Sequence, residues 1–314
     1  MEPAASVIFF TTASGAGYGM LALLGILAPL GLLPAGPWFG AFSGGISLAL
    51  VSAGLLSSTA HLGHPERAWR AFSQWRSSWL SREGVLSLAS YPPALAFGLL
   101  WMWTGRPQGI AALFGALTAV MALLTIGCTA MIYASLKPIR QWHNRLVLPG
   151  YLVFGLFSGC ICLHALALLW GGPAVPSAVA GIVLGLAALA VKLLYWRRID
   201  TEAPASTAES ATGLGHLGKV RLLDAPHTEE NYLLKEMGFR LARKHAARLR
   251  RIALAAAFVL PVLLAALSLV LPALPAAVAA LAGAVLVLAG LLVERWLFFA
   301  EAKHTVVLYY GRTA

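Results

Sequence analysis

The stretch GIAALFGALTAVMALLTIGCTAMIYA, residues 109–134, decides the fold class of this chain. It holds no Asp, Glu, Lys or Arg, and it is longer than the about 20 apolar residues that a helix needs to cross a hydrocarbon core. Seven further apolar stretches accompany it, with Pro- and Gly-rich breaks between several of them. The eight predicted spans are about residues 5–33, 38–61, 84–104, 109–134, 146–170, 176–196, 252–272 and 275–299.

The composition of the whole chain indicates the same class. Of its 314 residues, 59% are hydrophobic and 11% are charged, against about 45–50% and about 25% in soluble globular proteins. These values exclude a soluble enzyme, a disordered chain and a nucleic-acid binder, the last despite a net charge of +11. We therefore expect an all-α polytopic membrane protein. Residues 1–314 form a single membrane domain, a bundle of eight transmembrane helices with one cytoplasmic loop at 199–251. The first span is expected to be retained, because MEPAAS at residues 1–6 lacks the basic residues of a signal peptide.

The positions of the basic residues predict the orientation of the bundle. With the eight predicted spans, 22 of the 23 Lys and Arg residues fall on one side, and Arg106 alone falls on the other. Connections rich in Lys and Arg stay on the cytoplasmic side of a membrane. Both termini and the long connections are therefore predicted to be cytoplasmic, where the positive charge would meet anionic lipid or an acidic partner protein.

The predicted loop at 199–251 is the largest extramembrane segment. It begins with a linker-like stretch at 203–207, and residues 229–251 have helical spacing with a basic C-terminal half. The loop is too short for a catalytic domain but long enough to hold another subunit. The residues expected to dock that partner are Tyr232, Met237, Phe239 and Arg243.

Neither the cysteines nor the histidines indicate a bound cofactor. The three cysteines lie in apolar stretches without C-x-x-C spacing, so no metal-ligating residue and no iron–sulfur cluster are predicted. A bis-histidine haem needs two deep histidines, whereas His164 is the one histidine well inside a predicted span; we expect it to be a hydrogen-bonded packing residue and expect no haem. GLGHLG at 213–218 fits the dinucleotide pattern G-x-G-x-x-G, but it follows a linker rather than a strand, so no nucleotide site is predicted.

Few charged residues fall inside the predicted spans. Glu83 lies at the start of the third, and Glu294 and Arg295 lie near the end of the eighth. An ion-coupled transporter is expected to carry ionisable groups through the membrane, so this pattern disfavours transport.

A polar cluster is predicted at the cytoplasmic ends of the second and third spans. His61, Gly63 and Arg67 follow the second span and Glu83 opens the third; consecutive antiparallel spans return these groups to the same depth. A histidine beside a carboxyl group at the edge of an apolar bundle suits a quinone head group, whose oxygens accept hydrogen bonds and exchange two protons with two electrons. Arg67 is expected close enough to favour the ionised form of Glu83. The same residues would also suit interfacial anchoring.

At these residues the chain resembles a known family. HLGxPxRA at 61–68 and LSxE at 80–83 resemble the quinol-site segment of the DmsC family, the eight-helix membrane anchors of dimethyl sulfoxide reductase-type molybdoenzymes. Tyr133, Ser135, Pro138 and Trp142 are similar to that family's Tyr…Pro-x-Trp stretch. Several loop stretches resemble the branch that includes anchors of cytoplasmic sulfite dehydrogenases: 211–215, 226–228, 231–233, 236–239 and 242–245. The chain departs from the pattern at Gly84, where other members place an aliphatic residue.

The resemblance implies a membrane anchor without catalytic residues of its own in the bacterial inner membrane. It implies a bound quinone or quinol, either menaquinone or ubiquinone, at His61, Gly63, Arg67 and Glu83. It also implies an iron–sulfur electron-transfer subunit docked on the cytoplasmic face and a molybdopterin catalytic subunit beyond it. Dimethyl sulfoxide reduction, as in anaerobic respiration, would oxidise quinol, whereas sulfite oxidation would reduce quinone.

Two other functions stay open at this point: a polytopic transporter and a purely structural membrane tether. Transport would show substrate flux without partner subunits, and a tether would show no inhibition by quinone analogues.

Overall fold

The chain folds into an elongated bundle of helices. The computed structural model describes residues 5–60, 62–203, 206–224 and 245–310, and these residues contain no strand. Eight of the described helical stretches are long and apolar enough to cross a membrane, which confirms the predicted fold class. They are α1 (Ala5–Leu27), α2 (Pro37–Thr59), the pair α3 (Trp79–Ala89) and α4 (Tyr91–Thr104), α5 (Ile110–Ala134), α6 (Val147–Leu169), α7 (Ala174–Thr201), the series α11 (Ala246–Ala253), η3 (Leu254–Val259) and α12 (Leu260–Leu267), and α13 (Ala273–Ala300).

The helix ends differ from the predicted spans where helical structure and apolar sequence do not coincide. The first helix ends at Leu27 rather than near 33, because the chain turns through Gly31, whose φ is 72°. The third begins earlier, at Trp79, where the Ser78 hydroxyl accepts a hydrogen bond from the backbone N–H of Ser81. The sixth helix extends into polar sequence as far as Thr201. The seventh begins in polar sequence, at Ala246. The connection between them is therefore shorter than the predicted 199–251.

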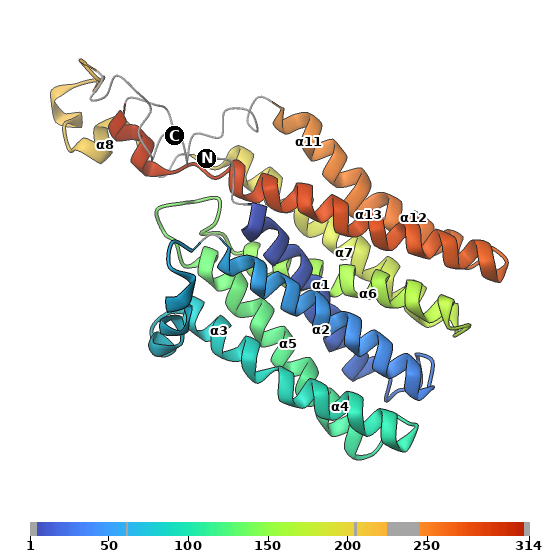
Figure 1. Cartoon of the computed structure of the whole chain (residues 1–314). Coiled ribbons are helices and arrows are strands. Elements are labelled where there is room, and N and C mark those ends of the chain that lie inside the picture. The colour runs from blue at the N-terminus through green and yellow to red at the C-terminus, as the bar shows by residue number, and fades with distance from the viewer. Residues whose placement is uncertain (1–4, 61, 204–205, 225–244, 311–314) are drawn as a thin grey trace.

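Helix α1 lies at the centre of the bundle and packs against α2, α5, α6 and α13 (Figure 1). Its small residues allow this close approach. A methyl group on Gly19 would overlap the carbonyl group of Gly155 in α6, and one on Gly25 would overlap Gly115 in α5. These two glycines therefore bring α1 into close contact with α6 and α5.

The outer surface of the bundle is apolar. On α5 the exposed side chains include Leu113, Leu117, Val120 and Leu124, which recur at helical spacing. Such a surface suits lipid hydrocarbon, since lipid tails are as apolar as leucine.

Two of the spans are irregular. The third is broken at Ser90, between α3 and α4, where Pro92 and Pro93 lack backbone N–H groups. The seventh contains the π-helical segment η3 just before Pro261. There the backbone around Ala257 lies so close to α13 that Gly290 has no room for a Cβ atom.

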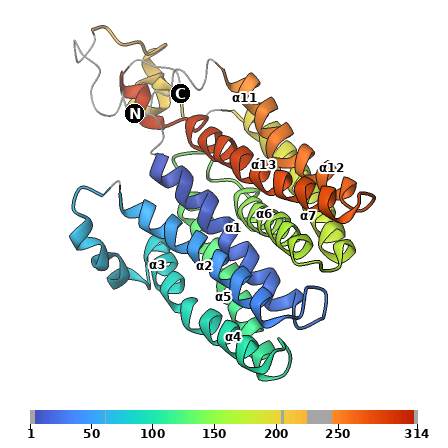
Figure 2. The same ribbon diagram turned by 45° about the vertical axis from the view of Figure 1, so that its right-hand side comes forward.

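The two ends of the bundle are unlike each other (Figures 1 and 2). One end carries the start of α1, the end of α13 and the long connections. These connections hold η1 (Pro65–Gln74), the chain between α5 and α6, and the short helix α8 (Ala208–Thr212). The other end carries four short connections. We call the end with the long connections the loop end of the bundle. Glu83, Lys192 and Glu294 all lie in the half of the bundle nearest to it.

Candidate functional site

Glu83 is buried in the second turn of α3, with 5% of its surface exposed. The hydroxyl group of Thr129 in α5 donates a hydrogen bond to its Oε1 atom. An ionisable group at this depth is costly, and in membrane proteins such groups usually serve a function. The pair joins two helices that are both partly exposed to lipid elsewhere along their length.

The segment η1 folds back onto the start of α3 beside Glu83. The hydroxyl group of Ser81 donates to the carbonyl of Ala71, and Arg82 Nε donates to the carbonyl of Trp75 over 3.0 Å. The ring of Phe72 packs against Gly84, where an added Cβ would lie 2.9 Å from the ring. Gly84, the departure from the family pattern, therefore makes room for η1 next to Glu83.

The predicted site residues that the structure describes differ in burial. Gly63 and Arg67 are exposed in the connection after α2, and the Arg67 Nε atom lies 3.7 Å from the carboxylate of Glu66. Glu83 is buried against Thr129, and the guanidinium of Arg67 lies beside Glu66. The expectation that Arg67 neighbours Glu83 stays a prediction. His61 lies outside the described residues.

A second buried cluster, which the sequence did not predict, links α7 and α13. The Lys192 Nζ atom lies 2.5 Å from Glu294 Oε1, and the Arg295 Nε atom lies 3.5 Å from Glu294 Oε2. All three residues are at most 4% exposed. Lys192 lies over the rings of Tyr195 and Trp196, and the Arg295 guanidinium lies 3.8 Å from the ring centre of Tyr151. We call Lys192, Glu294 and Arg295 the buried triad.

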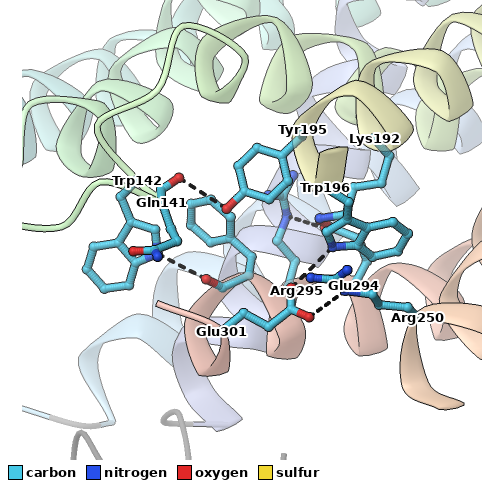
Figure 3. A network of polar contacts seen from close by, with 10 residues as sticks. Gln141, Trp142, Lys192, Tyr195, Trp196, Arg250, Glu294, Arg295 and Glu301 are labelled. Atoms are coloured by element: carbon cyan, nitrogen blue, oxygen red, sulfur yellow. Dashed lines mark hydrogen bonds and ion pairs between the residues drawn. The ribbon is translucent and has the colours of Figure 1, made fainter. Parts of the chain in front are cut away.

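The polar contacts continue from the buried triad toward the loop end (Figure 3). Trp196 Nε1 donates to Glu301 over 3.2 Å, and Arg250 Nε donates to the same carboxylate over 2.6 Å. Arg250 also makes two hydrogen bonds, of 2.7 and 2.9 Å, to Asp200. These contacts tie the ends of α7, α11 and α13 together.

Lys192 was missed because it was counted with the basic connection that follows, although it lies inside the predicted sixth span at 176–196. The helix continues to Thr201, which leaves Lys192 inside the bundle. A usable signal was the opposite charge of Glu294 in the eighth span, since two charges of opposite sign within apolar spans are often paired.

His164 is a hydrogen-bonded packing residue, as predicted. It is fully buried, and its two ring nitrogens lie 2.9 Å from the hydroxyl groups of Ser177 and Ser268. The three cysteines are buried within helices. In the described part of the chain, no group of three or more His, Cys, Asp or Glu side chains is placed to hold a metal ion.

The fold and these contacts define a class: a multi-pass membrane protein with buried ionisable groups near one end. Residues 1–311 match the family described as "DMSO reductase anchor subunit (DmsC)". The chain belongs to this family, as the sequence motifs indicated.

A curated relative agrees with this assignment. The chain is 36% identical over 329 residues to a sulfite dehydrogenase subunit of Allochromatium vinosum, and the match covers 100% of both chains. No solved structure matches the chain. The protein is therefore a membrane anchor of an oxidoreductase complex, which it forms with other subunits.

Proposed function

We propose that this anchor binds quinone beside Glu83 and passes electrons between the quinone pool and a docked iron–sulfur subunit. The observation that carries the proposal is the buried carboxyl group of Glu83, held by Thr129 within the LSxE motif. A buried ionisable group near the membrane surface is suited to exchange protons with a quinone, since each quinone takes up two protons with its two electrons.

The roles of the motif residues follow from their chemistry. His61 bonds one quinone oxygen through a ring nitrogen, and Glu83 passes protons to or from the other side of the head group. Gly63, after the end of α2, and Arg67, in η1, form the exposed approach to the site. Thr129 positions the carboxyl group of Glu83.

We further propose that the complex oxidises sulfite, as the name of the relative from Allochromatium vinosum suggests. A molybdopterin subunit would convert sulfite and water to sulfate, two protons and two electrons. The iron–sulfur subunit would carry the electrons to the anchor, where the quinone is reduced. Both partners would lie on the cytoplasmic face of the inner membrane, where the loop end of the bundle is proposed to be.

The described part of the loop supports partner docking. Leu217 and Leu223 are 75% and 97% exposed in a segment outside the membrane-spanning helices. Large exposed apolar side chains in such a position are typical of a protein interface. The docking residues proposed from the sequence, Tyr232, Met237, Phe239 and Arg243, lie outside the described residues.

The proposal is tested by comparing two turnover rates in membranes that carry the complete complex. Soluble dyes accept electrons from the partner subunits directly, whereas quinone turnover requires the anchor. His61→Ala removes a hydrogen bond worth about 1–3 kcal/mol when its partner stays buried, so it should weaken binding of a quinone analogue about ten- to a hundredfold. Glu83→Gln should slow quinone-linked turnover while dye-linked turnover survives. Equal loss of both rates would assign the residues to assembly instead.

A further inference from the structure

A small cavity lies between α1, α5, α6 and α13, next to Glu83. Thr129, which holds the Glu83 carboxyl group, lines one side, and Arg295 of the buried triad lines another. The cavity has room for about one water molecule. We call it the hydroxyl chamber, because hydroxyl side chains make up much of its wall: Thr11, Thr12, Ser14, Tyr18, Thr129, Tyr151 and Ser158.

Three of these hydroxyl groups are buried without a hydrogen-bond partner among the described residues. They belong to Thr12, Tyr18 and Tyr151, three residues of α1 and α6 that line the cavity. Each unpaired buried hydroxyl costs free energy. Water in a polar cavity usually makes two to four hydrogen bonds, so the arrangement of these groups suits a bound water.

A second cavity adjoins the hydroxyl chamber and reaches the buried triad. It shares Tyr151, Phe154 and Arg295 with the first and is also lined by Lys192 and Glu294. The Oε2 atom of Glu294 is buried without a hydrogen bond among the described residues. Tyr195, on the wall of the second cavity, donates to the carbonyl of Gln141 over 3.1 Å. Gln141 lies in the connection between α5 and α6 (Figure 3), so polar groups extend from Glu83 to the loop end.

We propose that the hydroxyl chamber is filled with water and carries protons between Glu83 and the buried triad. This inference rests on the proposed function, in which Glu83 exchanges protons with a quinone. When Glu83 gives its proton to a quinone oxygen, the Thr129 hydroxyl passes its own proton to the carboxylate and takes one from the chamber water. Water at the loop end replaces that proton, and quinol oxidation runs the same steps in reverse.

The charge of the buried triad suits this role. Within the buried triad, Lys192 and Arg295 share Glu294, which leaves one positive charge on the triad when all three are ionised, and Arg295 lies at the chamber wall. A positive charge at the chamber wall disfavours an excess proton resting in the chamber. Protons would therefore pass through without being trapped.

The test uses the complete complex in lipid with the variants Thr12→Val and Tyr151→Phe, each of which removes one unpaired hydroxyl. The matched control is Thr118→Val in α5, whose buried hydroxyl bonds its own helix at Phe114 and lies away from the chamber. Quinone-linked turnover should fall about tenfold or more in the two variants. It should also become more sensitive to deuterated water, while binding of a quinone analogue and the control variant stay unchanged.

Thermal stability gives a second readout. If the chamber holds water, each variant removes a hydrogen bond and the melting temperature falls. If the chamber is dry, each variant removes an unpaired hydroxyl and the melting temperature rises or stays the same, which would overturn the proposal. A high-resolution structure of the unaltered complex should show a water in contact with Tyr151 Oη, and an empty chamber there would contradict us even if the variants fail to fold.

The two proposals fail in different ways. Unchanged quinone-linked turnover and isotope sensitivity in Thr12→Val and Tyr151→Phe, with slow turnover in Glu83→Gln, would remove the chamber from the proton path and leave the quinone site standing. Normal turnover in Glu83→Gln would remove the quinone site itself.

Discussion

Lys192 and Glu294 place a full ion pair inside an apolar bundle, which is the least expected feature at the scale of single residues. The two charged atoms lie 2.5 Å apart, and each side chain is about 1–2% exposed. A buried pair adds little net stability when it is complete, but removing one partner leaves an unpaired charge that is strongly unfavourable. Glu294 is also the ion-pair partner of Arg295, so one carboxylate serves both cations.

This reasoning predicts opposite outcomes for single and double variants. Glu294→Gln should lower the free energy of unfolding by about 3–5 kcal/mol, because Lys192 and Arg295 stay buried without the carboxylate that they share. Adding Lys192→Met should restore part of that loss, because it removes one of the two unpaired charges. Denaturant or thermal unfolding in detergent would measure both, with Lys137→Met, an exposed lysine of the connection after α5, as the neutral control. A double variant less stable than the single one would show that the two side chains do not act as a pair.

Glu83 and Lys192 also show how far the sequence leads at this scale. Glu83 could be found because it opens an apolar span within a short motif. Its partner Thr129 could not, since hydroxyl residues recur in the fourth span and 46 positions separate the two. The pairing of Lys192 with Glu294 joins helices 102 positions apart, and no local pattern specifies it.

At the scale of helices, glycines of α1 set the distance between neighbours. Gly19 touches the backbone of Gly155 in α6, whereas Gly15, one turn earlier on the same helix, has nothing within 4 Å of the position of a Cβ atom. The same substitution should therefore have opposite effects at the two positions.

We expect Gly19→Ala to separate α1 from α6 and to lower the melting temperature markedly, because backbone atoms cannot move aside as a flexible side chain would. Gly15→Ala should be neutral or slightly stabilising, since alanine favours a helix over glycine by about 1 kcal/mol. Thermal unfolding of the purified protein measures both. Equal effects at the two positions would contradict the packing of α1 described above.

The connection after α7 is the second element with a distinct prediction. Its helix α8 packs against the C-terminal segment η4 (Thr305–Tyr310), where the Tyr309 hydroxyl donates to the carbonyl of Ala211 over 2.8 Å. This contact holds the exposed leucines that follow α8 at the loop end.

Leu217→Asp together with Leu223→Asp should weaken retention of the partner subunits, since a charge replaces apolar surface at the proposed interface. Co-purification through a tag on the anchor would show the loss. Leu30→Asn provides the control, because this leucine is exposed at the opposite end of the bundle. Full retention in the double variant would move the docking surface elsewhere, and deleting residues 211–228 would then test the rest of the loop.

At the scale of the whole molecule, the apolar stretches were enough to predict eight spans, because hydrocarbon thickness fixes helix length. They were not enough to predict where helices end. α7 and α11 continue into charged sequence once neighbouring helix ends supply partners, as Arg250 does for Asp200 and Glu301. The central position of α1 also followed only from the structure.

The uneven distribution of basic residues predicts that the loop end faces the cytoplasm. Reporter fusions after Ala314 and within residues 203–207 should be active only as cytoplasmic reporters. Periplasmic activity at either position would overturn the topology, and with it the side on which the partner subunits are proposed to dock.

Photolabelling would show directly whether quinone binds beside Glu83. A photoreactive quinone analogue would be bound to the complete complex in lipid, illuminated, and located by mass spectrometry of the digested anchor. If quinone binds beside Glu83, we expect labelling within residues 59–84 and around Thr129. Excess quinone should prevent this labelling, and His61→Ala should reduce it. Labelling confined to other spans, or equal labelling with and without competing quinone, would contradict quinone binding beside Glu83.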